Sequence, residues 1–208
     1  MPPKRKITEE MLIEAAMGIV KEQGINFVTA RTAAKAADCS IQPVFACFGT
    51  MDNFKEQIFL SALNDFMSRL DEFSDSADHF GKVCTAVIKL AAEEPNIYRL
   101  LFCEQVCSGR TASALRESFV KHRKYLDKMI TMYGLNEKCC VEIIGKGIVY
   151  LCGISGIISA DSSYSDVKKG TAEVKMVFAD LVIAAQRKRD NEKKHIVRKI
   201  NDESDMSG

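Results

Sequence analysis

Apolar residues recur at spacings of three and four along almost the whole chain, and no stretch sustains a strict alternation of apolar and polar residues. The first spacing gathers apolar side chains on one face of an α-helix, whereas alternation would be typical of a strand. Proline, which interrupts helices, occurs only four times in 208 residues. The pattern therefore predicts an all-α protein without a β-sheet.

The first part of the chain contains clear signals for three helices. Thr8 is suited to cap the first helix, Gly24 to end it, and Thr29 to cap a short second helix rich in alanine. Ser40 is expected to cap a third helix. Pro43 would then occupy one of its first positions, where the missing amide removes no helical hydrogen bond.

The third helix is expected to depend on its neighbours, because a helix of about eight residues is only marginally stable alone. Val44 and Phe48 lie four residues apart and supply a side that can be buried. The other side is largely apolar yet directed outward, which indicates a binding partner. It is formed by Ile41, Gln42, Phe45 and Ala46.

Six further helices complete a predicted total of about nine. Their expected ranges are 51–73, 79–93, 95–107, 112–133, 136–160 and 166–189. The chain is thus expected to divide into an N-terminal domain over 1–50, a larger helical domain over 51–189, and a charged, mobile tail over 190–208.

Charge decides little at the level of the whole chain, which has 29 Lys and Arg against 28 Asp and Glu. Lys4, Arg5 and Lys6 form a local basic arm. The segment around them contains no apolar run of the length that a signal peptide needs, so we expect a cytoplasmic protein whose eight cysteines are thiols.

Several classes of function are disfavoured by missing motifs. The cysteines do not form the paired spacings of a zinc site, and the chain has no GxSxG, HExxH, Walker or GxGxxG motif, so we expect no metal, no cofactor and no enzymatic activity. The most apolar run, residues 143–159, is interrupted by Lys146 and four glycines. It is shorter than the roughly 20 apolar residues of a transmembrane helix, so no membrane association is expected.

The stretch GINFVTARTAAKAADCSIQPVFACFGTMDNFKEQIF, residues 24–59, has the pattern of two short helices joined by a tight turn. It resembles the DNA-binding region of the TetR family of bacterial transcriptional regulators, and the likeness extends from about Ile7 to Phe59. Three positions depart from the family pattern. Phe45 lacks the phosphate-binding tyrosine hydroxyl, Asp38 replaces the turn glycine, and Met51 replaces a phosphate-binding lysine, a role that Lys55 could take over.

The resemblance implies an N-terminal helix-turn-helix domain that contacts a palindromic double-stranded DNA operator. Arg31 would address guanine and Gln42 adenine, while apolar residues of the third helix would meet thymine methyl groups. The basic arm would contact phosphates or the minor groove. The implied DNA-binding residues are Lys4, Arg5, Lys6, Thr29, Arg31, Ser40, Ile41, Gln42, Pro43, Phe45, Ala46 and Lys55.

The resemblance also implies a C-terminal domain that encloses a ligand cavity and forms a homodimer. Composition alone does not distinguish a cavity lining from an ordinary core. The candidate lining residues, suited to an apolar effector, are Phe80, Tyr98, Phe102, Cys103, Phe119, His122 and Tyr150. The candidate dimer residues are Gly153, Gly156, Val174, Phe178, Leu181 and Val182.

These expectations together describe a homodimeric repressor that a small apolar effector releases from its operator. An alternative is a regulator that senses oxidants. In that case Cys103 and Cys107, expected one turn apart on a helix, or Cys47 in the third helix would change DNA affinity when oxidised.

Overall fold

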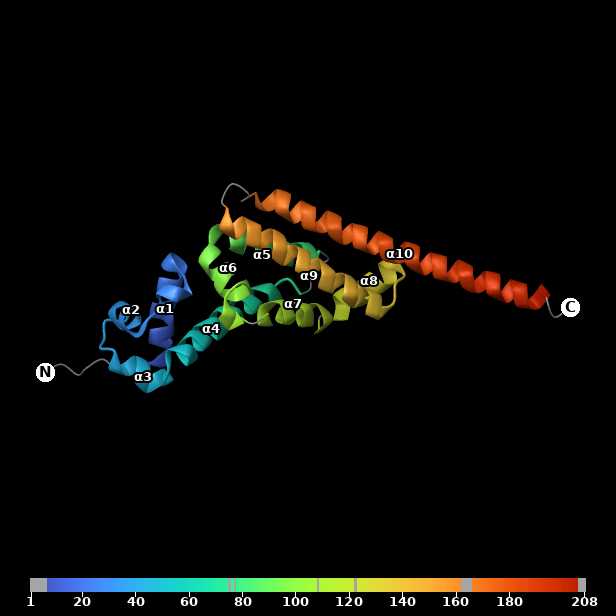
Figure 1. The fold of residues 1–208 in the computed structure, drawn as a ribbon. Helices are drawn as coiled ribbons and strands as arrows, with labels where there is room; N and C mark the ends of the chain where they lie inside the picture. Colours follow the sequence, from blue (N-terminus) through green and yellow to red (C-terminus); the bar gives the residue numbers. More distant parts are fainter. Residues whose placement is uncertain are drawn as a thin grey trace.

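The computed structural model describes residues 7–74, 76, 78–107, 109–121, 123–161 and 166–205 (Figure 1). Over these ranges the chain forms ten α-helices and two short 3-10 helices and no strand. The predicted all-α fold is confirmed. A small head at one end of the molecule contains the N-terminal helices, and a larger helical body carries the C-terminus at the other end.

The head is built from three short or medium helices around a shared core. All of its predicted helices are present. Their bounds are Glu9–Gln23 for α1, Ala30–Ala36 for α2 and Gln42–Phe48 for α3, with a 3-10 helix, η1, at Ile25–Phe27.

The predicted caps of the first two helices are confirmed. The Thr8 hydroxyl accepts a hydrogen bond from the Met11 amide at 3.3 Å, and Thr29 forms a capping box with Thr32. Gly24 has a φ of 93°. Asp38 adopts the left-handed conformation with a φ of 51°, as expected for an aspartate in place of a turn glycine.

The predicted cap of α3 is wrong. The helix begins at Gln42 with Ile41 at the N-cap position and without a side-chain cap, so Ser40 lies before the helix. The first turn closes on the Ile41 carbonyl, which accepts from the Val44 amide at 3.1 Å. Pro43 still lies in that first turn, where its missing amide costs no helical bond.

Helix α4, Met51–Asp71, runs from the head into the body. Thr50 caps it by accepting from the Asn53 amide at 3.2 Å, and the Asn53 side chain donates to the Phe48 carbonyl at 2.9 Å. The rings of Phe48 and Phe54 stack with centroids 4.5 Å apart. The end of α3 is therefore fixed to the start of α4 by polar and apolar contacts.

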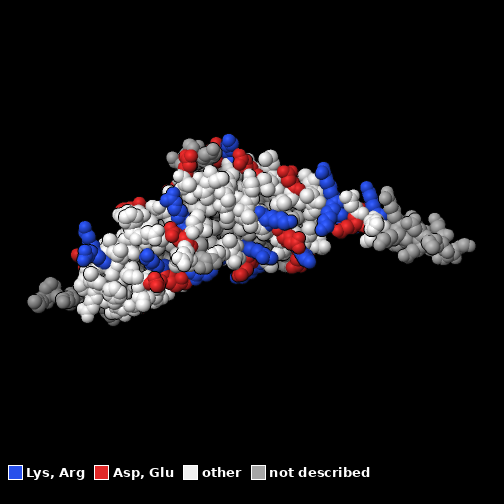
Figure 2. Space-filling model, viewed as in Figure 1, with Lys and Arg blue, Asp and Glu red and all other residues white. Residues whose placement is uncertain are grey.

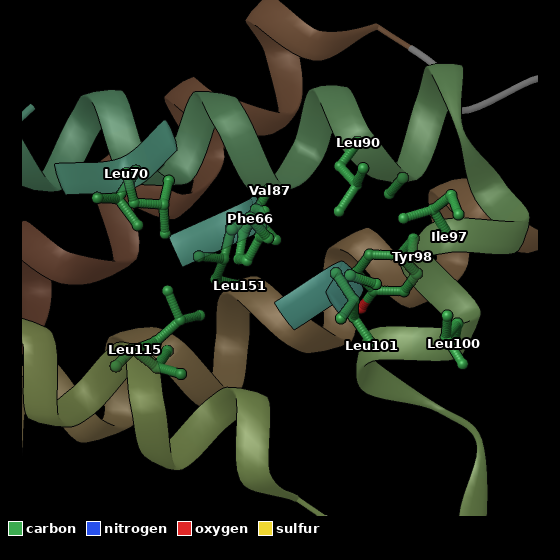
Figure 3. Close-up of a cluster of buried hydrophobic side chains, with 14 of the residues drawn as sticks. Phe66, Leu70, Val87, Leu90, Ile97, Tyr98, Leu100, Leu101, Leu115 and Leu151 are labelled. Atoms are coloured by element: carbon green, nitrogen blue, oxygen red, sulfur yellow. The ribbon is translucent and has the colours of Figure 1, made fainter. Parts of the chain in front are cut away.

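The body packs six further helices and the second half of α4 around a core of leucine, isoleucine, phenylalanine and tyrosine side chains (Figure 3). Helices α5, α9 and α10 lie against one another, and α6 and α7 also contact α9. The bounds are His79–Glu93 for α5, Pro95–Phe102 for α6, Arg110–Lys121 for α7, Arg123–Tyr133 for α8, Glu137–Ala160 for α9 and Val167–Asp205 for α10, with a 3-10 helix, η2, at Gln105–Cys107.

Three predicted helix boundaries in the body are wrong. A helix was expected over 95–107, but α6 ends at Phe102. The Arg99 carbonyl accepts from the amides of Cys103 and Glu104, and these two hydrogen bonds close the last turn. The range 112–133 forms two helices, α7 and α8, which accounts for the tenth helix of the described chain.

The third correction concerns α10, which continues to Asp205 instead of ending near Arg189. The segment 190–205, for which a mobile tail was expected, contains neither glycine nor proline to end the helix. Arg189 and Gln186 donate to the carbonyls at the end of α8, at Tyr133 and Gly134. Beyond this attachment α10 projects away from the body (Figure 1).

Helix α9 is long and apolar enough to cross a membrane by length and composition alone. However, 44% of its most apolar window is buried inside the protein. Because α5, α6, α7, α8 and α10 all contact it, α9 has the character of a central helix in a helical domain.

Candidate functional site

The outward side of α3 has the composition and exposure of a binding surface. Ile41 is 40% exposed and Phe45 46% exposed, while Gln42 and Ala46 are exposed beside them. Val44 and Phe48, on the opposite side of the same helix, are buried. The predicted division of α3 into a buried and an outward side is therefore present, and we call its outward side, Ile41, Gln42, Phe45 and Ala46, the reading face.

The other predicted DNA-contact residues surround the turn between α2 and α3 or lie on the adjoining helices. Thr29 caps α2 and Arg31 is its second residue, and both are exposed. Ser40 is exposed in the turn, Pro43 is half-buried, and Lys55 is half-buried on the second turn of α4. Lys4, Arg5 and Lys6 lie outside the described residues.

Charge is distributed unevenly within the head, although residues 1–60 contain seven basic and seven acidic side chains. Helix α3 carries no charged residue. In Figure 2 the head shows a white area as well as basic and acidic side chains. Arg31 and Lys35 lie on α2, whereas Glu9, Glu10 and Glu14 lie on α1. An uncharged reading face is suited to hydrogen bonds and methyl contacts with base edges. Cations that contact the DNA phosphates would then come from neighbouring elements such as α2.

Two sets of polar contacts attach the head and α4 to the body. The Arg110 guanidinium of α7 donates to both carboxylate oxygens of Glu56 on α4, at 2.6 and 2.8 Å, and lies 4.3 Å from the Phe59 ring centroid. This hydrogen-bonded pairing lowers the pKa of Glu56. A bidentate pair of this kind fixes the mutual orientation of the two helices.

The second attachment passes through the short helix α6. The Asn96 side chain donates to the Lys21 carbonyl of α1 at 3.1 Å, and the Arg99 side chain donates to the Ser159 carbonyl of α9 at 2.6 Å. The Tyr98 hydroxyl donates to the Cys152 carbonyl at 2.8 Å. Helix α6 thus bridges the first helix of the head and the central helix of the body.

The predicted effector residues do not surround one cavity. Tyr98 and Phe102 stack at 4.8 Å, and Phe66 meets Phe102 edge-on at 6.0 Å. Phe66 and Tyr98 belong to the buried core in Figure 3, and Phe102 packs against that core. Phe80 and Phe119 form a second aromatic cluster. The remaining three are separate: Cys103 is exposed, Tyr150 lies on the outer side of α9, and His122 is outside the described residues.

A pocket of about 220 Å³ opens beside the second aromatic cluster, between the start of α5, α8 and α10. We call it the distal pocket because it lies in the body, away from the head. Of the predicted effector residues only Phe80 lines it. Most of its lining was not predicted from the sequence as an effector site. The lining includes Asp78, Tyr125, Lys128, Met129, Lys175 and Phe178, the last of which was predicted at the dimer interface.

A larger, open groove of about 790 Å³ separates α9 from the start of α10. Its floor is apolar, and Val149 and Ile157 are 73% and 56% exposed. Lys169 and Glu173 of α10 form part of its rim. We call this feature the α9/α10 groove. Figure 2 shows a broad uncharged area over the middle of the face in view.

The predicted dimer residues fall into two sets in the structure. An outward apolar stripe was expected at Val174, Phe178 and Val182. The structure instead buries all three side chains in the core of the same chain. Gly156 faces the Tyr98 hydroxyl, whereas Gly153 faces open space in the α9/α10 groove and Leu181 is half-buried. The exposed apolar side of α10 is formed instead by residues that include Met176 and Ile183.

The basis for thiol sensing is weakened by the geometry. Cys103 follows the end of α6 and Cys107 ends η2, so they do not share a helix, and the Cys107 side chain is outside the described part. Burial, with Glu9 and Glu10 nearby, raises the pKa of Cys47 and so lowers its thiolate fraction. Among the described residues, no group of three His, Cys, Asp or Glu side chains is placed to hold a metal ion.

No family model and no curated protein matches the chain. Solved structures do match its fold. A transcriptional regulator from Rhodococcus sp. RHA1 superposes with a TM-score of 0.65 at 16% identity, covering 86% of this chain and 98% of that one. A TetR variant from Acinetobacter baumannii AYE, bound to minocycline, gives a TM-score of 0.55 at 14% identity over 88% of this chain and 99% of that one. The chain has the TetR-family fold.

A third structure with the TetR-family fold is RolR in complex with resorcinol. It gives a TM-score of 0.58 at 14% identity, covering 86% of this chain and 93% of that chain. Because each match spans both the head and the body, the TetR-family fold accounts for the whole arrangement of an N-terminal helix-turn-helix and a helical C-terminal domain.

Proposed function

We propose that the chain is a homodimeric transcriptional repressor whose head binds a palindromic operator. The observation that carries the proposal is the reading face, where exposed apolar residues flank Gln42 at the start of a helix fixed from behind by Val44 and Phe48. A monomer gains nothing from exposing Ile41 and Phe45, whereas thymine methyl groups in the major groove would cover them. The TetR-family fold supports the same function.

Substituting Arg31 or Gln42 with alanine is expected to weaken binding to the specific operator by about 1–3 kcal/mol, as loss of a contact to a base edge does. Binding to random duplex DNA should change little. The measurement is a fluorescence-anisotropy titration with both duplexes at one salt concentration, using the DNA upstream of the protein's own gene as the first operator to try.

Lys35→Ala is the matched control, because Lys35 is also an exposed cation on α2 but lies one turn beyond Arg31. Its loss should affect both duplexes to the same small extent. Equal losses on operator and random DNA for Arg31→Ala would assign Arg31 to phosphate instead of a base. Unchanged operator affinity for both alanine variants would overturn the proposed reading face.

We also propose that two copies pair through the α9/α10 groove. Val149 and Ile157 expose apolar surface there, and Gly153 leaves room for close approach of a second helix. The rim carries Lys169 and Glu173, so a twofold arrangement can place opposite charges against each other. Pairing also serves the small reading face, since two linked heads bind one palindrome far more tightly than one head.

The proposed signal is a small apolar molecule that binds the body and lowers operator affinity. Structures with the TetR-family fold hold minocycline and resorcinol, which supports a small-molecule effector here. The attachments of the head through Glu56–Arg110 and through α6 are the contacts by which a change in the body would reach the head. By linkage, an effector that releases DNA must bind more weakly to the DNA-bound protein.

The attachment between α4 and α7 is expected to contribute pH-dependent stability. Glu56→Gln should lower the free energy of unfolding at pH 7 by up to about 1 kcal/mol, the range of partly exposed ion pairs. Because Arg110 lowers the pKa of Glu56 in the folded state, this stabilisation is present above about pH 4.3 and is lost as the pH falls through the lowered pKa. The two proteins should therefore converge in acid.

Thermal unfolding between pH 3 and pH 7 measures this difference. Glu93→Gln is the control, since Glu93 pairs with Lys89 at 3.7 Å with both side chains 60% exposed, and it should have little effect at any pH. A Glu56→Gln protein as stable as wild type at pH 7 would show that the bidentate pair contributes nothing to stability.

A further inference from the structure

The distal pocket has apolar walls made from three helices. The Phe80 and Phe178 rings lie with centroids 4.1 Å apart, and both side chains are at least 94% buried, with exposures of 5% and 6%. Met129 of α8 is 2% exposed and Tyr125 is half-buried. Phe80, Phe178 and Met129 therefore form a closely packed apolar wall behind the pocket, and the half-buried Tyr125 offers its ring and phenol to a planar guest.

The size of the distal pocket limits what it can hold. Its volume of about 220 Å³ is smaller than the roughly 300–1,000 Å³ of sites for drug-sized ligands. A compound with one aromatic ring and a short substituent fits such a space, whereas a polycyclic ligand or a long acyl chain does not. In the centre of the body Tyr98 stacks on Phe102, and Phe66 meets the Phe102 ring edge-on.

The lining of the distal pocket includes charged side chains that an anion can meet. Lys175 and Lys128 contribute two ammonium groups, and Asp78 contributes one carboxylate, 2.7 Å from the Lys175 ammonium. Gly81 is necessary for this placement, because a side chain there would collide with Lys175. Burial raises the pKa of Tyr125, so its phenol stays protonated and can donate a hydrogen bond.

We propose that the distal pocket is a binding site for a single-ring aromatic anion, such as an aromatic carboxylate. Its ring lies against Phe80, Phe178 and Met129, and its anionic group meets Lys175 and Lys128 at the pocket mouth. As the effector site of a repressor, this assignment rests on the function proposed above, with an aromatic anion in place of a wholly apolar effector. Asp78 also caps α5 by accepting from the Gly81 amide at 3.2 Å, so an anion that competes for Lys175 acts directly on the contact between α5 and α10.

The test uses sodium benzoate as the probe, with benzyl alcohol and benzylamine as neutral and cationic probes of the same size. Binding to the full-length protein is measured by calorimetry or ligand-detected NMR. Benzoate should bind most tightly and benzylamine most weakly. Lys175→Met should weaken benzoate binding about tenfold, as expected for a charge-assisted hydrogen bond, and leave benzyl alcohol binding nearly unchanged.

Ala179→Trp is the blocking variant, because Ala179 is an exposed lining residue at the pocket. Ala172→Trp is its matched control, an exposed alanine two turns earlier on the same helix and outside the lining. Benzoate binding should be abolished by the first substitution and kept by the second. Equal binding by both variants, or preference for benzylamine in the wild type, would overturn the site.

Operator affinity is measured separately with and without saturating benzoate, so that the two proposals can fail independently. Benzoate that binds with the expected variant pattern but leaves operator affinity unchanged confirms the pocket and overturns its role as the effector site. A protein that releases its operator with another compound, yet shows no benzoate binding, keeps the proposed function and overturns the distal pocket as a site for aromatic anions.

Discussion

Replacing Ile157 with glutamate is expected to convert the protein into a monomer that no longer binds its operator. Ile157 is 56% exposed in the α9/α10 groove, where the proposed pairing would bury it. A twofold interface would then contain two new carboxylates in an apolar environment, and each would lose its hydration without a partner. Because the side chain is exposed in the single chain, the fold itself should tolerate the change.

The loss of operator binding follows because a monomer loses the gain in affinity that comes from linking two heads. Joining two weak binding sites can raise the overall affinity by about 10²–10⁴ without any new contact. A monomer with an intact reading face should therefore lose about that factor on a palindromic operator. On a single half-site, the monomeric variant and the wild type should bind with similarly low affinity.

Ile196→Glu is a close control for this experiment. Ile196 is 57% exposed, almost the same as Ile157, but it lies on the projecting end of α10. That variant should remain dimeric and bind DNA. Sedimentation equilibrium gives the oligomeric state and anisotropy gives the affinity. If Ile157→Glu remains a dimer in sedimentation, the two copies do not pair through the α9/α10 groove.

The parts of the fold that could be predicted from the sequence are those determined by local interactions. Caps at Thr8 and Thr29 act on amides three residues away, and the left-handed turn at Asp38 depends on one residue and its neighbours. The two sides of α3 follow from helical periodicity, since Val44 and Phe48 share one side. None of these features requires knowledge of distant segments.

The predictions that failed concern what covers an apolar surface: another segment of the same chain, a second copy of the protein, or a ligand. Periodicity identifies an apolar stripe on α10, but it does not reveal that Val174, Phe178 and Val182 pack inside the same chain while Met176 and Ile183 face outward. For the same reason, aromatic residues of the body could not be divided into core and pocket. Tyr98 is 1% exposed and packed in the core, whereas Phe80 reaches the distal pocket.

Phe54→Ala is expected to destabilise the head by about 3–5 kcal/mol, the cost of removing a large buried aromatic side chain. Phe54 is fully buried and stacks on Phe48 at 4.5 Å. Helix α3 has only seven residues and no side-chain cap, so its stability depends on this contact and on the burial of Val44. Loss of the Phe54 ring should therefore release α3 before the rest of the molecule.

The expected result is a protein that keeps its body and its dimer but cannot bind the operator. Hydrogen exchange should show lost protection mainly in α1–α3 and the first turns of α4, because Phe54 lies at the start of α4, whereas Phe66 and Leu70 pack nearer its other end. Phe27→Ala is the control, as Phe27 is also a head phenylalanine but is 57% exposed, and its substitution should change stability by less than about 0.5 kcal/mol. Uniform loss of protection throughout α5–α10 in Phe54→Ala would show instead that head and body unfold as one cooperative unit, in which case α4 transmits the stability of the head to the body.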